Sequence, residues 1–138
     1  MKGHVPVRIV MSQTCNLPEE ANLWNVHDAY TIVATQRGAR RDFQKKLAMK
    51  GVEVVEFDML NPRDVMSYCY DRGYLSVLWE CGGTLSAAAI SARVIHKVNA
   101  FLFHCIFSCT FTYISDIART YPECLFTAFV YSSSLASV

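Results

Sequence analysis

The sequence of 138 residues has almost no excess of charge of either sign. It contains 13 lysines and arginines against 12 aspartates and glutamates, a formal net charge of +1 with neutral histidines. This balance excludes a strong net field as the main basis of function, so we expect neither a nucleic acid nor an anionic membrane as the principal partner. Internal repeats and low-complexity tracts are also missing, and the length suits one domain with a core of its own.

Motifs for metal chemistry and for secretion are missing as well. The four histidines are isolated, none stands in an H-x-E or H-x-x-x-H pattern, and His104, Cys105 and Cys109 lack a fourth ligand at a usual spacing. Zinc deaminase chemistry is thereby excluded, and no metal site is predicted. The chain opens without the basic start and small-residue cleavage site of a signal peptide. We therefore expect the six cysteines to be free and mostly buried thiols.

Short apolar runs alternate with helical patterns over the first hundred residues. Strands are expected at 7–11, 30–34, 52–57, 75–80 and 97–103, and helices at 39–50, 62–72 and 84–93. Asn61 is expected to cap the second helix, with Pro62 in its first turn and Gly73 at its end. Strands that are apolar nearly throughout and are separated by helices favour a parallel sheet covered on both faces. The sequence therefore predicts an α/β fold with about five strands, mostly parallel, and about three helices.

The run LSVLWECGGTLSAAAI at 75–90 joins an apolar strand to an alanine-rich helix through Gly82 and Gly83. Glycines at the end of a strand let the backbone press against a pyrophosphate, and the helix that follows directs free N–H groups and its positive dipole end at the phosphate. Thr84 is expected to cap this helix. The run lacks the complete G-x-G-x-x-G pattern, so a tightly packed turn is the alternative that spacing alone leaves open.

Four segments together resemble one protein family. They are PVRIVMSQ at 6–13, ATQRGARRDF at 34–43, GVEVVEFDMLNPRDVM at 51–66 and the run at 75–90, within a likeness over about residues 5–102. The chain resembles the reductase domain of the riboflavin-biosynthesis deaminase/reductase family, in particular its plant pyrimidine reductases. The resemblance implies a dihydrofolate-reductase-like three-layer fold, here incomplete. It also implies NADPH-dependent reduction of 5-amino-6-(5-phosphoribosylamino)uracil to the ribitylamino product.

The resemblance implies site residues too. Glu80, just before the glycines, corresponds to the acidic residue that holds the pyrimidine ribosyl phosphate substrate, and a solvated strand-end glutamate is the alternative. Ser12, at the end of the first strand, corresponds to a contact with the adenosine half of the cofactor. The segment that wraps the NADPH pyrophosphate is matched by Gly82, Gly83, Thr84, Leu85, Ser86, Ala87 and Ala88. The sequence assigns no catalytic residue.

Five basic residues gather near the second predicted strand and the helix after it: Arg37, Arg40, Arg41, Lys45 and Lys46. Arginines near a strand end suit a bidentate hold on a phosphate, and a solvated helix face is the alternative interpretation. Aromatic residues are sparse among them, so RNA or another nucleic acid is not expected as a partner.

From about residue 103 the sequence changes in character. Residues 103–138 have only Asp116, Arg119 and Glu123 as acidic or basic side chains apart from a histidine, and show neither a helical stripe nor strict alternation. The family would continue here with Pro-Lys and Gly-Gly segments, and none is present. We therefore divide the chain into a partial reductase domain at 1–102 and a non-family apolar tail at 103–138.

The same comparison with the family leaves alternatives for function. A strand and loop with substrate-contacting Lys and Asp have no counterpart on the N-terminal side, so the chain is expected to be truncated there and impaired when alone. One alternative is a non-catalytic isoform that associates with full-length reductase or forms a homodimer. Another is membrane association through 98–115, which lacks Asp, Glu, Lys and Arg but is only just long enough for a span. The resemblance implies a chloroplast location, and a cytoplasmic one stays open because no transit segment is visible.

Overall fold

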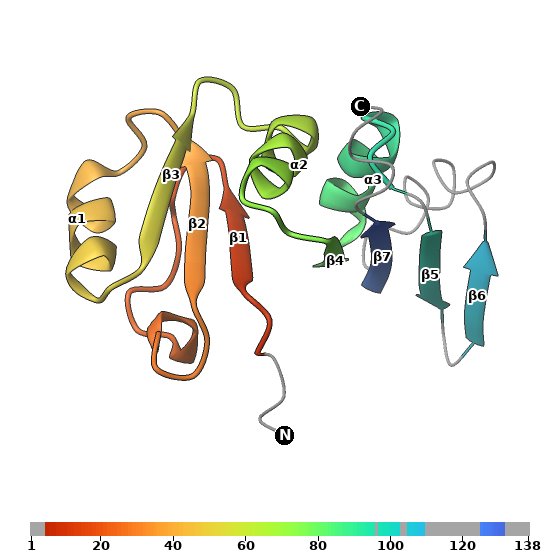
Figure 1. Cartoon of the computed structure of the whole chain (residues 1–138), viewed down its shortest axis with the longest axis horizontal. Coiled ribbons are helices and arrows are strands. Elements are labelled where there is room, and N and C mark those ends of the chain that lie inside the picture. The colour runs from red at the N-terminus through yellow and green to blue at the C-terminus, as the bar shows by residue number, and fades with distance from the viewer. Residues whose placement is uncertain (1–4, 96, 103–104, 110–124, 132–138) are drawn as a thin grey trace. The chain divides into compact units, whose positions relative to one another are not determined.

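The computed structural model describes residues 5–95, 97–102, 105–109 and 125–131 (Figure 1). Side chains are described over residues 5–95. The chain divides into two units, Met1–Leu60 and Asn61–Val138. The first contains three strands and one α-helix, and the second contains two α-helices and four strands among the described residues.

The first unit is built on a parallel sheet in the order β1-β2-β3. The strands are β1, Arg8–Ser12; β2, Thr31–Gln36; and β3, Glu53–Phe57. Val33 in the central strand lies opposite Val10 on one side and Val54 on the other. Five of the six residues of β2 are buried, as expected for an inner strand. Because the strands are parallel, their carboxyl ends lie at the same edge of the sheet.

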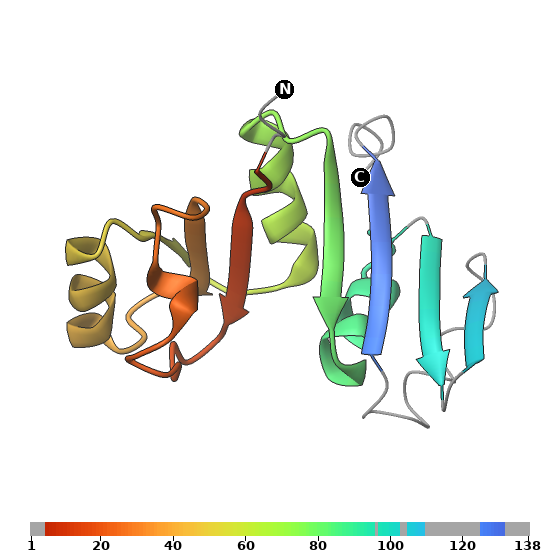
Figure 2. The same cartoon turned by 90° about the horizontal axis from the view of Figure 1, so that it is seen from below.

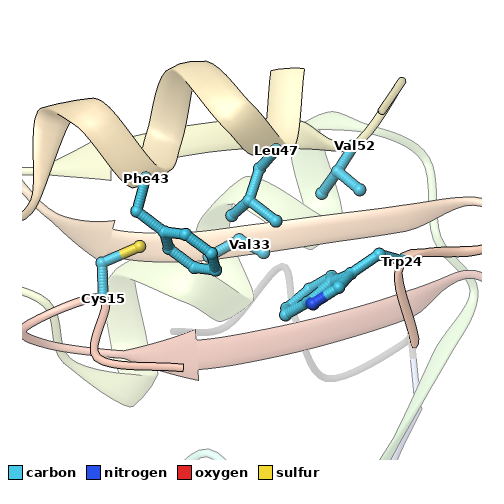
Figure 3. Packing of buried hydrophobic residues seen from close by; sticks show 6 residues of the cluster. All are labelled: Cys15, Trp24, Val33, Phe43, Leu47 and Val52. Carbon is cyan, nitrogen blue, oxygen red and sulfur yellow. The ribbon is translucent and has the colours of Figure 1, made fainter. Parts of the chain in front are cut away.

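Helix α1, Arg41–Met49, covers one face of this sheet. Figure 3 shows Phe43 and Leu47 pointing from the helix toward Val33 and Trp24. The two helical residues are four positions apart and therefore lie on the same face of the helix. The ring of Phe43 meets that of Trp24 edge to face, with 6.2 Å between centroids. This cluster is the core of the first unit.

Two loop features fix the ends of that core. Trp24 closes a short 3₁₀ turn, Asn22–Trp24, and its Nε1–H donates to the Pro18 carbonyl at 2.8 Å. After α1, Gly51 adopts φ of +82°, a left-handed conformation that favours glycine. The helix therefore ends where the sequence predicts, and the chain turns directly into β3.

The second unit contains α2, Pro62–Asp71; β4, Ser76–Cys81; α3, Gly83–Ser91; β5, Lys97–Leu102; β6, Cys105–Cys109; and β7, Leu125–Tyr131. Its strands form a sheet in the order β4-β7-β5-β6, antiparallel at every described pairing (Figure 2). At the start of α2, Asn61 Oδ1 accepts the backbone N–H of Asp64 at 2.9 Å, with Pro62 as the first helical residue. Gly73, with φ of +74°, follows its end.

The predicted α/β class, its three helices and its five strands are confirmed, in agreement with a dihydrofolate-reductase-like fold. The parallel pairing is confirmed for β1–β3, whereas β4 and β5 pair antiparallel with β7. The sequence does not predict β6 and β7, because CIFSC and LFTAFVY lack the alternation of polar and apolar residues that marks a half-buried strand.

Three further expectations concern cysteines, metals and membranes. Cys15 and Cys69 are buried free thiols and Cys81 is a half-buried one, as predicted, while the other three lie outside the described side chains. Over the described residues, no group of three or more His, Cys, Asp and Glu is arranged to hold a metal ion. Nor is any helix there long and apolar enough to cross a membrane. Within the predicted span 98–115, the described residues belong to strands β5 and β6.

Cys69 makes the stability of the second unit sensitive to alkaline pH. Its side chain is fully buried on α2, and loss of hydration raises the pKa of the thiol from 9.0 to about 11. Since the folded state then holds the thiol proton more tightly than the unfolded chain, this contribution is fully present below pH 9 and is lost as the pH rises toward 11.

We expect the free energy of unfolding to fall over that interval by at most about 2–3 kcal/mol on account of Cys69. In Cys69→Ala the same interval should show a shallower fall, because the titrating group is gone. Urea unfolding of both proteins at a series of pH values, followed by circular dichroism, measures the two slopes. Parallel slopes would contradict the assignment to Cys69.

Candidate functional site

The glycine-rich segment forms the turn between β4 and α3. Gly82 precedes the helix with φ −74° and ψ 175°, and its carbonyl accepts the Ser86 N–H at 3.1 Å. Gly82 is exposed and Gly83 is buried. Because any residue can adopt the φ of Gly82, the contribution of the glycine at that position is the absence of a side chain and not left-handed freedom. Backbone can therefore be approached closely at this turn.

The first turn of α3 has the electrostatics of an anion site. The N–H groups of Gly83, Thr84 and Leu85 precede the first helical hydrogen bond and have no acceptor within the helix. The turn is described throughout and contains no acidic residue, so no side chain of its own neutralises the positive end of the helix dipole. The expectation that Thr84 caps the helix is wrong, because β4 extends to Cys81 and the cap position falls on Gly82.

Helix α3 places the predicted cofactor residues on different faces. Gly83 and Ser86 are buried, Thr84 and Ala88 are exposed, and Leu85 and Ala87 lie between these extremes. The Ser86 hydroxyl lies 3.2 Å from the Cys81 thiol, inside the unit. A ligand at the turn can thus reach Gly82, Thr84 and the free N–H groups, whereas Ser86 has a packing role.

Cys81 stays a protonated thiol. Burial raises its pKa above 9.0, and the hydrogen bond with Ser86 lowers it by less. A raised pKa removes the thiolate that a nucleophile requires. Cys81 therefore lacks the lowered pKa of an activated nucleophile, and its contact with Ser86 of α3 is one of packing.

Glu80 lies at the carboxyl end of β4 beside the glycine turn. Successive side chains of a strand point to opposite faces, so Glu80 points away from the face on which Cys81 meets Ser86. Its side chain is exposed and has no hydrogen-bond or ion-pair partner within the described part of the chain. Its Cα lies opposite that of Thr127 in β7. Within the described part of the chain, nothing competes for the carboxylate as an acceptor of hydrogen bonds from a polar ligand.

Trp79 offers a spectroscopic reporter next to this site. It is 6% exposed, and its Nε1–H has no acceptor among the described residues. It directly precedes Glu80 and lies three residues from Gly82 in the sequence. A change at the turn is therefore expected to alter its fluorescence.

Ser12 stands in the first unit, at the carboxyl end of β1. Its Cα lies opposite Thr35 of β2, and its side chain is half-buried. Its hydroxyl has no partner among the described residues. The structure brings Glu80 and the glycine turn together within the second unit, and Ser12 belongs to a separate one.

Residues 1–107 match the family described as the RibD C-terminal domain. The chain belongs to this family. Residues 108–138 lie outside the match. The match thus covers all three α-helices of the structure and its strands β1–β5.

Individual relatives agree with the family match. The chain is 88% identical over 101 residues to a Zea mays protein named riboflavin biosynthesis protein PYRR, chloroplastic, covering 73% of this chain and 16% of the relative. It is 70% identical over 101 residues to the Arabidopsis thaliana protein of that name, covering 73% and 17%. It is 34% identical over 105 residues to 2,5-diamino-6-ribosylamino-4(3H)-pyrimidinone 5′-phosphate reductase of Aquifex aeolicus, covering 71% and 45%. The chain spans less than half the length of each, and no solved structure matches it.

The basic patch of this RibD C-terminal domain is largely neutralised by acidic partners. The ion pairs are Arg37–Asp58 at 2.5 Å, Arg40–Glu19 at 3.4 Å and Lys46–Glu19 at 2.8 Å. Hydrogen bonding and charge from Lys46 lower the pKa of Glu19, which keeps its carboxylate ionised at neutral pH. Arg41 and Lys45 have no ion pair in the described part of the chain. As a whole, the patch is a surface of paired charges rather than a cationic platform.

Proposed function

We propose that this chain is part of an NADPH-dependent reductase of riboflavin biosynthesis that acts on a ribosylaminopyrimidine 5′-phosphate. The observation that carries the proposal is the exposed Gly82 turn at the carboxyl end of β4, with Glu80 beside it, in a member of the RibD C-terminal domain family. The printed name of the Aquifex relative is that of such a reductase, and both plant relatives are named as riboflavin biosynthesis proteins.

The proposed roles follow the chemistry of each group. The free N–H groups at the start of α3 suit the pyrophosphate of NADPH, with Gly82 and Thr84 beside it. The Glu80 carboxylate accepts hydrogen bonds from ribose hydroxyls or pyrimidine N–H groups of the substrate. Ser12 contacts the adenosine half of the cofactor. Bound NADPH would supply a hydride for C1 of the ring-opened ribosyl imine, and the protein contributes alignment of the ligands and exclusion of water.

The proposed substrate is 5-amino-6-(5-phosphoribosylamino)uracil. The compound in the name of the Aquifex relative carries an amino group at pyrimidine position 2, where the uracil has an oxygen. Both compounds carry the ribosylamino phosphate. A comparison of the two therefore tests whether the protein also recognises the pyrimidine ring at position 2. We also propose a chloroplast location, which the names of the plant relatives support. We propose further that the chain consists of a reductase part at 1–102 and a non-family tail at 103–138, which the end of the family match at 107 supports. The described strands of this tail, β6 and β7, pair within the sheet of the second unit.

Nucleotide binding tests the proposal. NADPH is titrated into the chain carrying Trp24→Phe, so that the fluorescence comes from Trp79 alone, and NADH serves as the matched ligand. We expect saturable binding with at least about a tenfold preference for NADPH, as one charge-assisted contact to the extra phosphate supplies. Consumption of NADPH on addition of either pyrimidine then tests reduction. A folded chain that binds neither nucleotide would overturn the proposal.

A further inference from the structure

An arginine–aspartate pair stands at the carboxyl edge of the parallel sheet in the first unit. Arg37 directly follows β2 and Asp58 directly follows β3, and the preceding residues Gln36 and Phe57 lie opposite each other in the register. Arg37 Nη1 is 2.5 Å from Asp58 Oδ1, and the two side chains are 64% and 76% exposed. An ion pair so exposed is weak, so its guanidinium can exchange the aspartate for another oxyanion.

The backbone that carries Arg37 is held in place. Its N–H donates to the Phe57 carbonyl at 2.8 Å, and the next N–H, of Gly38, donates to Glu56 Oε1 at 2.9 Å. Gln44 Nε2 donates to the same carboxylate oxygen at 2.9 Å. The hydrogen bonds from Gln44 and then Gly38 lower the pKa of Glu56, so this anchor is ionised at neutral pH. A guanidinium mounted on a fixed backbone loses less entropy when it binds.

The location of Arg37 favours a phosphate on the adenosine side of a dinucleotide. In open parallel sheets, ligands bind outside the carboxyl ends of the strands, and an arginine there can accommodate a ribose 2′-phosphate. Ser12, assigned above to the adenosine half, ends β1 at this same edge, next to β2. Among the other arginines near this edge, Arg40 is held by Glu19 and its guanidinium carbon lies 4.9 Å from the centre of the Phe43 ring. Of the two arginines here that are paired with an acid, Arg37 is thus the one better placed to change partner.

We propose that Arg37 selects NADPH over NADH by binding the 2′-phosphate, and that Asp58 holds its guanidinium when no phosphate is bound. The inference rests on the proposed function. The 2′-phosphate must displace Asp58, so Asp58 competes with the ligand. Two planar N–H groups of the guanidinium then face two phosphate oxygens, which is the strongest geometry for such a pair.

Adenosine 2′,5′-bisphosphate tests this directly, because it carries the 2′-phosphate without the nicotinamide. Adenosine 5′-monophosphate is the matched ligand that lacks it, and calorimetry on the full chain measures both. In Arg37→Gln, we expect bisphosphate affinity to fall at least about tenfold while monophosphate affinity is unchanged. Lys45→Gln removes the same charge from an exposed helix position and should change the bisphosphate affinity by less than about twofold.

Asp58→Asn should change the bisphosphate affinity in the opposite direction. Removing the competing carboxylate should raise bisphosphate affinity by about threefold or more, whereas the exposed acid Glu20, changed to Gln as the charge-matched control, should leave it within about twofold. A pair with only a structural role would lower the affinity for both ligands alike, and that result would overturn the inference. The inference would also be overturned if Arg37→Gln still preferred the bisphosphate to the monophosphate. In that case NADPH binding and the proposed function would stand. A folded wild-type chain that binds neither the bisphosphate nor NADPH would overturn both.

Discussion

Replacing Gly83 by aspartate is expected to abolish NADPH binding. Gly83 is the buried first residue of α3, and its N–H lies at the positive end of the helix. The substitution puts a carboxylate at the same helix end as the proposed pyrophosphate, one residue from the exposed Gly82. Two like charges about 4 Å apart repel by about 4 kcal/mol at an effective dielectric constant of about 20, so we expect affinity to fall by at least about 100-fold.

Two matched variants separate charge from bulk. Gly83→Ala adds only a methyl group at the buried position, and Gly82→Ala adds one at the exposed position, whose φ of −74° suits alanine. Both should bind more tightly than Gly83→Asp. Because position 83 is buried, a carboxylate there costs desolvation energy, so circular dichroism must show unchanged helix content before the titration is interpreted. Titration by Trp79 fluorescence measures all three, and wild-type affinity in Gly83→Asp would remove this turn from the cofactor site.

Helix α2 shows why part of the fold could be predicted from sequence. Its boundaries depend on residues close together in the chain: Asn61 satisfies the N–H of Asp64, Pro62 has a φ suited to the first turn, and Gly73 adopts the left-handed conformation after the end. Such local chemistry acts whatever the tertiary structure. The same holds for Gly51 after α1.

Strand pairing in the second unit could not be predicted in this way. β7 lies between β4 and β5 although it comes after both in the chain, and its partners in β4 are about 50 residues away. Pairing over that distance depends on the energy of the whole sheet. The segment LFTAFVY does not alternate polar and apolar residues, so its sequence does not indicate which strand it pairs with. The entropy lost on closing the loop between the paired strands depends on the length of the connecting chain, and not on the residues of the strand.

For the candidate site, the sequence indicates where the segment lies in the fold but not which way each side chain points. Gly82 and Glu80 lie at the carboxyl end of β4, as the sequence indicates. The resemblance assigns Ser86 to the segment that wraps the NADPH pyrophosphate, yet the helical period turns it inward to Cys81. The Arg37–Asp58 pair was missed, although aligning the ends of the second and third predicted strands would have placed the two residues side by side.

Replacing Phe43 by alanine is expected to destabilise the first unit by about 3–5 kcal/mol. The side chain is 3% exposed and packs in the cluster of Figure 3, with its ring edge to face with Trp24. The Arg40 guanidinium carbon lies 4.9 Å from the ring centre, so the variant also loses a cation–π contact. The surrounding strands and helix hold the cavity open, because α1 cannot shift without moving Leu47 from the same cluster.

Urea unfolding in a Trp79→Phe background measures this effect, since Trp24 then reports on the first unit alone. Met49→Ala is the matched control: it shortens a side chain of the same helix that is 82% exposed and should change the free energy of unfolding by less than about 0.5 kcal/mol. Equal, small shifts in the two variants would mean that α1 does not depend on the cluster. The β2–α1 loop that carries Arg37 would then be held by its hydrogen bonds to Glu56 and to the Phe57 carbonyl.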